Sequence, residues 1–342
     1  MNNMGNETAF EQAIIPFFPT PFLGNRSTDT ETVMDETIAL PLKVYFEMTY
    51  RCNLTCRHCV TASSPYSDVS NELSTTRILE LVDEMAASGI RQITIGGGEP
   101  LIHPDWQKIF KYITNLGIKL IVKTNGTLLH ELNLQALKAV ALTEMQVAFD
   151  GGRHFHNSLR GRDNYEKALK GLKALICNDL NGIARYTYCN GADPELENMF
   201  QDIAATGCKF IKIALLKKAG RAKHEPDLMP QAGDAGLAHW LMGLGKKHGL
   251  KVQLASADFP IDFTKANALK QGEKECNACE AGFNTAYVSP KGHILSCVTM
   301  PNHAFGELHH QSFAKAWQSQ SAQTFKTKTG VCELKCVGIR IK

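Results

Sequence analysis

The chain has 342 residues, of which 44% are hydrophobic and 21% are charged, and this ordinary globular balance suits one large domain or two modest ones. The formal net charge is only +3, and basic and acidic residues are interspersed, so composition gives no argument for nucleic acid. No apolar run is long enough to span a bilayer, and the first residues lack the basic and apolar regions of a secretory signal. We therefore expect a cytoplasmic protein with no membrane or nucleic-acid partner.

Strand and helix patterns alternate through most of the chain, after an irregular, proline-rich extension over residues 1–41. Apolar, β-branched runs predict strands, and amphipathic stretches with caps or glycine stops predict helices. Strands are expected at 44–48, 92–96, 118–124, 144–150, 183–189, 209–216 and 251–255, and helices at 74–89, 103–117, 130–140, 164–179, 194–207 and 231–248. Such alternation predicts an α/β fold whose parallel sheet closes fully or partly into a barrel.

The pattern changes after about residue 256, where cysteines replace the alternation. A β-hairpin is expected in NTAYVSP–KG–HILSCV, a helix over 311–325, and then a tail containing CELKC. We interpret residues 42–255 as the barrel domain and residues 256–342 as a small cluster-binding domain.

Eleven cysteines are many for a chain without a secretory signal, and disulfides explain them poorly in a reducing compartment. Eight of them fall in two groups, at 52–59 and at 276–336, and this grouping points to metal. The other three, Cys177, Cys189 and Cys208, lie in apolar stretches and are expected in the core.

The first group, Cys52, Cys56 and Cys59 in CNLTCRHC, follows the first predicted strand. Three thiolates can bind three irons of a 4Fe–4S cluster and leave the fourth iron open to a small chelating ligand. The alternative is a structural zinc knuckle with His58 or His103 as its fourth ligand.

With this triplet the chain resembles the radical S-adenosylmethionine (SAM) superfamily from about residue 42 to the C-terminus. The resemblance implies a partial (β/α)6 TIM-type barrel, a 4Fe–4S cluster on the three cysteines, and SAM bound beside it. Other family motifs fall at the ends of predicted strands: GGGEP (96–100), TNGT (124–127), AFDGG (148–152), HNSLRG (156–161) and KKAGRA (217–222). Two positions depart from the family pattern, because Ala148 and Asn157 replace the usual serine and aspartate.

The resemblance also implies which residues contact SAM. Glycine backbone and a carboxylate in GGGEP suit the methionyl amino group. Arg160 would face the SAM carboxylate, and Asn125 the ribose, while the KKAGRA segment would lie near the adenosine. The full predicted set is Gly97, Gly98, Glu99, Asn125, Asp150, Arg160 and Asn190.

The second cysteine group resembles the SPASM and twitch extensions of this superfamily, in which a β-hairpin and a helix surround auxiliary clusters. Four ligands, Cys279, Cys297, Cys332 and Cys336, would hold one auxiliary 4Fe–4S cluster, as in a twitch or truncated SPASM domain. A four-cysteine zinc site is the alternative. Cys276 is left over, and it is a replacement ligand, a hydrogen-atom donor to a substrate radical, or a spare cysteine.

These features predict a radical SAM oxidoreductase or epimerase that cleaves SAM to a 5′-deoxyadenosyl radical, which abstracts a hydrogen atom from a substrate carbon. A one-electron reductant such as flavodoxin or ferredoxin is expected as a partner. The preferred substrate is a ribosomally made peptide, to be epimerised, oxidised or cross-linked. The alternatives are an aminoglycoside or other small natural-product intermediate and, in another class, a non-catalytic iron–sulfur electron carrier.

Overall fold

The computed structural model describes residues 39–129, 134–230, 235–255 and 281–327. Its strands form one curved sheet in the order β10-β9-β8-β1-β2-β3-β4-β5-β6-β7. The strands are β1 (Lys43–Glu47), β2 (Gln92–Gly96), β3 (Lys119–Thr124), β4 (Glu144–Phe149), β5 (Gly182–Tyr188), β6 (Phe210–Leu215), β7 (Lys251–Leu254), β8 (Thr285–Val288), β9 (His293–Leu295) and β10 (Ala304–Glu307). Neighbours from β1 to β7 are parallel, which confirms the predicted partial barrel in this part of the chain.

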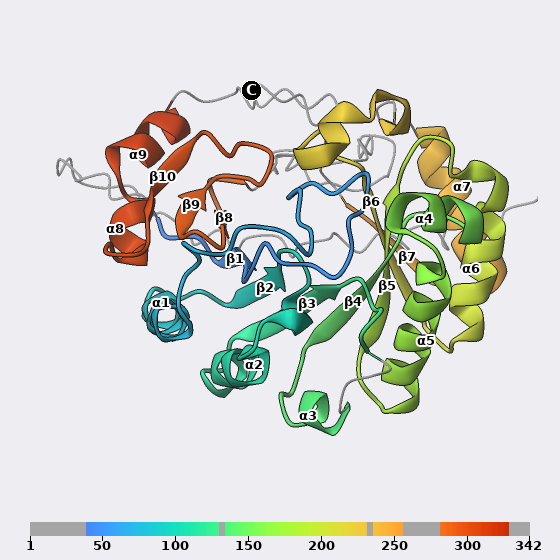
Figure 1. The fold of residues 1–342 in the computed structure, drawn as a ribbon, viewed down its shortest axis with the longest axis horizontal. Helices are drawn as coiled ribbons and strands as arrows, with labels where there is room; N and C mark the ends of the chain where they lie inside the picture. Colours follow the sequence, from blue (N-terminus) through green and yellow to red (C-terminus); the bar gives the residue numbers. More distant parts are fainter. Residues whose placement is uncertain (1–38, 130–133, 231–234, 256–280, 328–342) are drawn as a thin grey trace, which may run out of the picture.

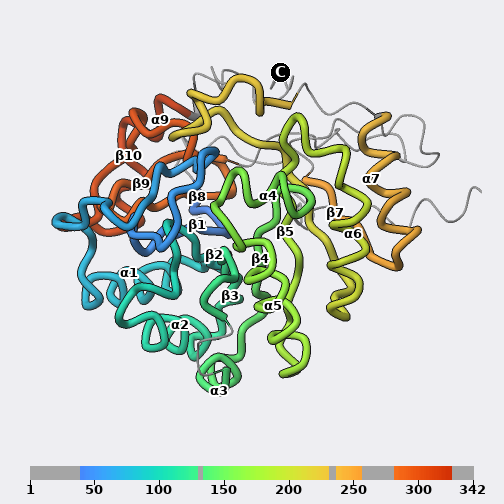
Figure 2. Tube along the Cα trace, turned by 45° about the vertical axis from the view of Figure 1, so that its right-hand side comes forward, coloured from blue at the N-terminus to red at the C-terminus, as the bar shows by residue number. Residues whose placement is uncertain are grey.

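Helices line the outside of the curve (Figures 1 and 2). They are α1 (Thr75–Ala87), α2 (Trp106–Asn115), α3 (Leu134–Lys138), α4 (Arg153–Arg160), α5 (Asn164–Cys177), α6 (Leu196–Ala205), α7 (Ala235–His248), α8 (Phe313–Trp317) and α9 (Gln320–Thr327), with 3-10 turns η1 (Pro100–Ile102), η2 (Asp193–Glu195), η3 (Gly220–His224) and η4 (Pro226–Leu228). Ser74 caps α1 as expected, because its side chain accepts the Arg77 N–H. No described helix is long and apolar enough to cross a membrane.

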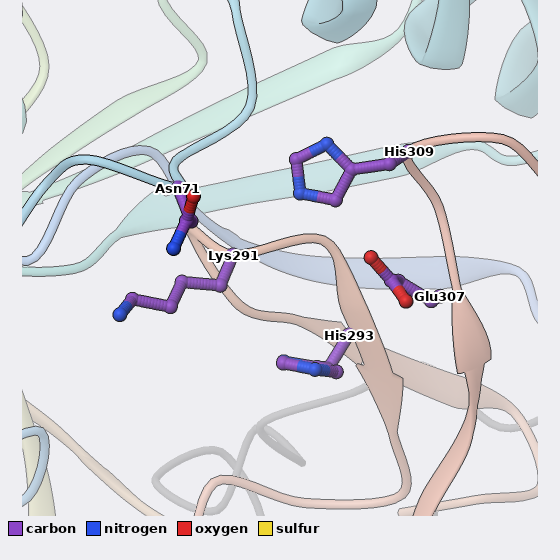
Figure 3. A pocket seen from close by; sticks show the side chains of 5 residues that line it. All are labelled: Asn71, Lys291, His293, Glu307 and His309. Carbon is purple, nitrogen blue, oxygen red and sulfur yellow. The ribbon is translucent and has the colours of Figure 1, made fainter.

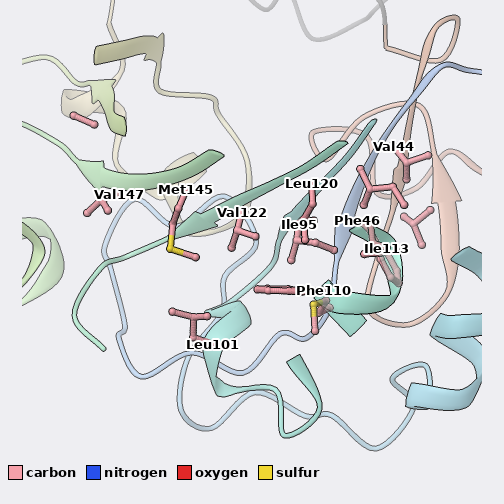
Figure 4. Close-up of a cluster of buried hydrophobic side chains, with 14 of the residues drawn as sticks. Val44, Phe46, Ile95, Leu101, Phe110, Ile113, Leu120, Val122, Met145 and Val147 are labelled. Carbon is pink, nitrogen blue, oxygen red and sulfur yellow. The ribbon is translucent and has the colours of Figure 1, made fainter. Parts of the chain in front are cut away.

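The main core lies between the sheet and this outer layer of helices (Figure 4). Val122 and Val147 on neighbouring strands and Phe110 and Ile113 on α2 are all fully buried. Because strand side chains alternate between faces, the residues between these apolar positions point to the inner face of the barrel. The outer face thus stabilises the fold, and the inner face is left for polar groups.

The C-terminal hairpin extends the barrel sheet. β8 pairs in parallel with β1, from Lys43 opposite Thr285 to Phe46 opposite Val288, and β9 and β10 then follow antiparallel. Figure 1 shows these strands beside β1, with α8 and α9 next to them. This pairing joins the hairpin that precedes Cys297 to the first strand of the barrel.

Two local expectations were wrong, and one further segment formed a helix for which no element was predicted. The helix predicted over 311–325 is two helices, α8 and α9, because the chain leaves the helical path at Gln318 and restarts at Gln320. The segment HNSLRG, expected only as a motif, forms most of α4. Cys177 is exposed and not in the core, because the buried face of α5 carries Ala168, Leu172 and Leu175. Cys189 and Cys208 are buried as expected.

Candidate active site

The cysteine loop, residues 50–67, leaves the C-terminal end of β1 and closes on itself. The Cys52 N–H donates to the Ser64 carbonyl at 3.1 Å. Cys52 is buried, and Cys56 and Cys59 are partly exposed. Burial raises the pKa of the Cys52 thiol to about 12 and that of Cys56 to about 11, so ligation by iron must displace protons from these sulfurs.

The glycines of GGGEP pack against the start of the cysteine loop. Gly98 and Glu99 donate their N–H groups to the carbonyls of Thr49 (2.7 Å) and Arg51 (3.0 Å). A Cβ on Gly98 would lie 2.0 Å from the Arg51 carbonyl oxygen, so only glycine fits there. The backbone of Gly98 therefore contacts the cysteine loop closely, and its predicted contact with SAM stays a prediction.

Glu99 links the ends of β2 and β3. It is fully buried, and its carboxylate accepts hydrogen bonds from the Thr124 hydroxyl (2.8 Å), the Asn125 N–H (2.8 Å) and the Leu101 N–H (3.3 Å). Burial raises the pKa of Glu99 to about 7, although these hydrogen bonds oppose the shift. The carboxylate is thus already satisfied by the protein on both oxygens.

Asn125 joins the TNGT turn to the cysteine loop. Its Nδ2 donates to Asn53 Oδ1 at 2.8 Å and lies 3.9 Å from Cys52 Sγ, while its Oδ1 accepts from the N–H and hydroxyl of Thr127. Asn53 returns a bond from its Nδ2 to Thr127 Oγ1 at 2.8 Å. Asn53 and Thr127 were not singled out from the sequence, because their roles depend on this contact between distant loops.

Asp150, at the end of β4, forms a buried ionic network. Arg160 on α4 donates to both carboxylate oxygens, with Nη2 at 3.0 Å from Oδ1, and His58 Nε2 lies 3.0 Å from Oδ1. Burial alone would raise the pKa of Asp150, but Arg160 and His58 hold it well below its usual value. The network ties α4 to the cysteine loop, whose Arg57 N–H also donates to the Leu159 carbonyl at 2.9 Å.

Asn190 lies farther round the sheet, after β5. It is exposed, and its N–H and Nδ2 donate to the carbonyls of Leu228 (3.0 Å) and Asp227 (3.1 Å) in η4. It therefore contacts the segment after β6 instead of the strand ends around Glu99. In that segment Arg221, which the sequence argument did not single out, contacts the cysteine loop directly.

The inner face of the barrel is polar and charged below these strand ends. Lys212 on β6 lies 2.6 Å from a carboxylate oxygen of Glu144 on β4, and Lys123 Nζ lies 4.2 Å from the centroid of the Tyr45 ring. Burial and the nearby charge of Arg185 hold the pKa of Lys123 well below its usual value. These charged groups are therefore buried within the barrel and interact with one another.

The seam between β1 and β8 carries a second buried carboxylate. Burial raises the pKa of Glu47 to about 7, while a hydrogen bond with Tyr287 and the charge of Lys123 oppose the shift. The second carboxylate oxygen of Glu47 has no hydrogen-bond partner. Cys297, just after β9, is partly exposed, and its Sγ lies 3.2 Å from Thr299 Oγ1. The other three predicted auxiliary ligands, Cys279, Cys332 and Cys336, and the left-over Cys276 lie outside the described residues.

A separate pocket of about 380 Å³ lies over the hairpin (Figure 3). It is lined by Asn71, Lys291, His293, Glu307 and His309, and none of these belongs to the predicted site. This pocket is therefore distinct from the strand ends that carry the family motifs.

The cysteine loop offers three sulfur donors and one histidine as possible metal ligands. The Cys52 sulfur accepts the Leu54 N–H at 3.4 Å, a contact suited to a thiolate ligand. His58 Nε2 lies 3.0 Å from Asp150 Oδ1, and its Nδ1 has no hydrogen-bond partner. The donor types alone therefore fit either an iron–sulfur cluster or a zinc ion.

Comparisons with known proteins agree with this geometry. Residues 46–205 match the model of the radical SAM superfamily, and residues 279–337 match that of the SPASM iron–sulfur cluster-binding domain. The AdoMet-dependent heme synthase of Methanosarcina barkeri is 27% identical over 323 residues, covering 88% of this chain and 92% of the relative. The mycofactocin maturase MftC of Mycobacterium tuberculosis is 25% identical over 287 residues, covering 82% of this chain and 71% of the relative.

Among solved structures, Streptococcus suis SuiB bound to the precursor peptide SuiA superposes with a TM-score of 0.71 at 13% identity, covering 86% of this chain and 68% of that one. This likeness supports the fold. The radical SAM domain implies a 4Fe–4S cluster and SAM, and the SPASM domain implies auxiliary iron–sulfur binding. The chain is therefore a member of the radical SAM superfamily with a C-terminal SPASM-type iron–sulfur domain.

Proposed function

We propose that this protein modifies a ribosomally made peptide by radical SAM chemistry, with Cys52, Cys56 and Cys59 as the ligands of the radical-forming cluster. When bound, the cluster and SAM supply a 5′-deoxyadenosyl radical that can take a hydrogen atom from an unactivated carbon. The observation that carries the proposal is the convergence of the cysteine loop with the GGGEP and TNGT turns, through the contacts of Gly98 and Asn125.

The predicted SAM-contact residues differ in depth, because Glu99 and Asp150 are 0% exposed, Asn125 is 7% exposed, and Gly97, Gly98 and Arg160 are partly exposed. Glu99 and Asp150 are fully buried and bonded to the protein, so we propose that they hold the strand ends and Arg160 in place. Backbone groups of Gly97 and Gly98 and the side chains of Asn125 and Arg160 are then the proposed direct contacts. Asn190 is the proposed SAM contact after β5, beside the η4 turn to which its side chain donates a hydrogen bond.

In the C-terminal region we propose Cys279, Cys297, Cys332 and Cys336 as ligands of one auxiliary 4Fe–4S cluster. The parallel pairing of β8 with β1 supports this proposal, because it joins the hairpin that precedes Cys297 to the strand that precedes the cysteine loop. Cys276 is the proposed hydrogen-atom donor. We retain the boundaries 42–255 and 256–342 for the two domains, and we propose a cytoplasmic location with flavodoxin or ferredoxin as the reductant.

The names of the relatives support a peptide substrate. A mycofactocin maturase and a fold neighbour crystallised with its precursor peptide both point to peptide modification. A heme precursor is the second candidate, because the relative named a heme synthase matches nearly its whole length, 92%.

Anaerobic reduction of the reconstituted protein with SAM tests the chemistry. Wild-type protein should form 5′-deoxyadenosine, and the triple variant Cys52→Ala/Cys56→Ala/Cys59→Ala should form none because it lacks the cluster ligands. Cys177→Ala, at an exposed thiol on α5, is the matched control and should retain the wild-type rate. Absence of 5′-deoxyadenosine from wild-type protein would favour the electron-carrier alternative.

Substrate class is tested by adding candidate precursor peptides or an iron-containing heme precursor to the same assay. A peptide substrate should show a mass change that depends on SAM and reductant, and deuterium uptake from heavy water would indicate epimerisation. Loss of that uptake in Cys276→Ala, with iron content unchanged, would support this thiol as the donor. Turnover of the heme precursor and none of the peptides would overturn the peptide proposal.

A further inference from the structure

The segment after β6, residues 217–229, packs against the cysteine loop from the opposite side of the barrel mouth. It contains η3 and η4, drawn in yellow in Figure 1 near the blue loop that follows β1. One contact is an exposed ion pair in which Arg57 Nη2 lies 2.6 Å from a Glu225 carboxylate oxygen. Exposed pairs of this kind contribute little, so the specificity of the packing must come from elsewhere.

Arg221 supplies that specificity. Its guanidinium donates to three main-chain carbonyls of the cysteine loop: Nε to Cys56 at 2.8 Å, Nη1 to Ala62 at 2.7 Å and Nη2 to Ser63 at 2.8 Å. Its own N–H donates to the Cys59 carbonyl at 2.9 Å. One residue thus bonds to the backbone of both partly exposed cysteines and to the return path of the loop.

Gly220 makes this approach possible. Its φ is +53°, and a Cβ there would lie 2.4 Å from the carbonyl oxygens of both Cys59 and Val60. The backbone of the 217–229 segment therefore touches the backbone of the loop at the residue before Arg221. The guanidinium fork matches several acceptors at fixed angles, which a lysine ammonium on a flexible stem cannot reproduce.

We infer that Arg221 is a positioning residue that fixes the loop backbone around Cys56 and Cys59 and so governs how firmly the radical-forming cluster is held. No contact of Arg221 with substrate or cofactor is part of the inference. Arg221 acts only through the backbone of the two cysteines. The inference rests on the proposed function insofar as those cysteines are cluster ligands. Arg221 belongs to the KKAGRA segment, for which the family resemblance implies only a position near the adenosine.

The test uses the full-length, anaerobically reconstituted protein and the variant Arg221→Lys, which keeps the charge but loses the fork. Iron release to a chelator and the electron paramagnetic resonance spectrum of the reduced protein, with and without SAM, are the readouts. Loss of outer contacts typically weakens a metal site roughly 10- to 100-fold, so iron release from the radical-forming cluster should accelerate by about that factor. Lys223→Ala, at an exposed position in the same turn, should match wild type.

The triple variant Cys52→Ala/Cys56→Ala/Cys59→Ala provides the spectrum of any auxiliary cluster alone. In Arg221→Lys the SAM-sensitive signal should decline while the auxiliary signal persists. Unchanged iron release together with an unchanged SAM-sensitive spectrum would overturn the inference. If wild type and the triple variant bind equal iron, the cluster assignment itself fails.

A second measurement separates local from global effects. In the metal-free protein, limited proteolysis should cut within residues 56–63 faster in Arg221→Lys than in wild type, with circular dichroism unchanged. Gly220→Ala should show the same pattern, because its Cβ would push the two backbones apart. Equal cleavage of this loop in all three proteins would contradict the role of Arg221 even if the cluster assignment had failed.

Discussion

Two buried carboxylates, Glu99 and Asp150, organise the strand ends by opposite electrostatic means. Glu99 is held by neutral donors, and its pKa rises to about 7 through burial. Asp150 is held by Arg160 and His58, and its pKa stays well below its usual value. Removing a partner from a buried ionic network leaves an uncompensated charge and costs more than removing a neutral donor.

Glu99→Gln should destabilise the protein even without SAM. In glutamine, an amide nitrogen replaces one of the two acceptor oxygens. In one orientation this nitrogen would face the Asn125 N–H, and in the other it would face the Thr124 hydroxyl and the Leu101 N–H, so two donors would meet in either case. We expect a loss of about 1–3 kcal/mol in the free energy of unfolding, the usual cost of an unsatisfied buried group. Denaturant unfolding of SAM-free protein measures it, with the half-exposed Glu80→Gln on α1 as control. Unchanged stability combined with weaker SAM binding would instead indicate that Glu99 faces the ligand.

At the residue scale, the sequence singled out residues that stand in family motifs. It did not single out residues whose role depends on a contact with a distant loop. Glu99 and Asn125 could be found because they stand in recognisable strings at strand ends. Arg221 could not, because its acceptors are backbone carbonyls of a loop about 160 residues away and carbonyls carry no sequence signature. Asn53 and Thr127 were missed for the same reason.

At the scale of elements, the turn after β2 and the cysteine loop behave as one packed unit. Gly98→Ala should disrupt it, because the new Cβ would lie 2.0 Å from the Arg51 carbonyl oxygen and the backbone would have to move. Gly96→Ala is the matched control, since nothing lies within 4 Å of its Cβ position. We expect Gly98→Ala to lose the iron of the radical-forming cluster after reconstitution, about half of the iron in two 4Fe–4S clusters, and Gly96→Ala to retain it, as measured by iron analysis. Equal iron in both variants would contradict the close packing.

The local pattern predicted the parallel strands as short apolar, β-branched runs, and most of their helices as amphipathic stretches with caps or glycine stops. It failed where local order depends on tertiary packing. β10 (Ala304–Glu307) is short and contains a glycine, so it carries no strong strand pattern. α4 begins at Arg153 after the N-cap residue Gly152, which has no side chain to cap the helix, so its start carries no strong helix signal. The pairing of β8 with β1 was also beyond the local pattern, since register between distant strands is not written in either strand alone.

For the whole molecule, the continuous sheet makes the barrel and the hairpin one structural unit, and Glu47 lies at their seam. Its pKa is about 7 in the folded protein and 4.5 for an ordinary glutamate, so the folded state binds an extra proton between these values. Stability therefore falls as pH rises through this window, by up to about 3 kcal/mol. Glu47→Gln removes the titration and should gain stability over wild type as pH rises from 5 to 8.

Denaturant unfolding across this pH range measures the difference. Tryptophan fluorescence and circular dichroism should report the same transition if the sheet unfolds as a unit. A difference between Glu47→Gln and wild type that stays constant with pH would contradict the buried titration.

The pairing of β8 with β1 also has a consequence for how the protein forms during synthesis. The Leu42 N–H donates to the side chain of Asn284, 242 residues later, so one edge of β1 stays open until nearly the whole chain has left the ribosome. Contacts of such long sequence separation slow folding, because a large loop must close before they stabilise anything. An exposed strand edge is also a site for aggregation, so a nascent chain of this kind would gain from a chaperone that covers β1 until residue 288 emerges.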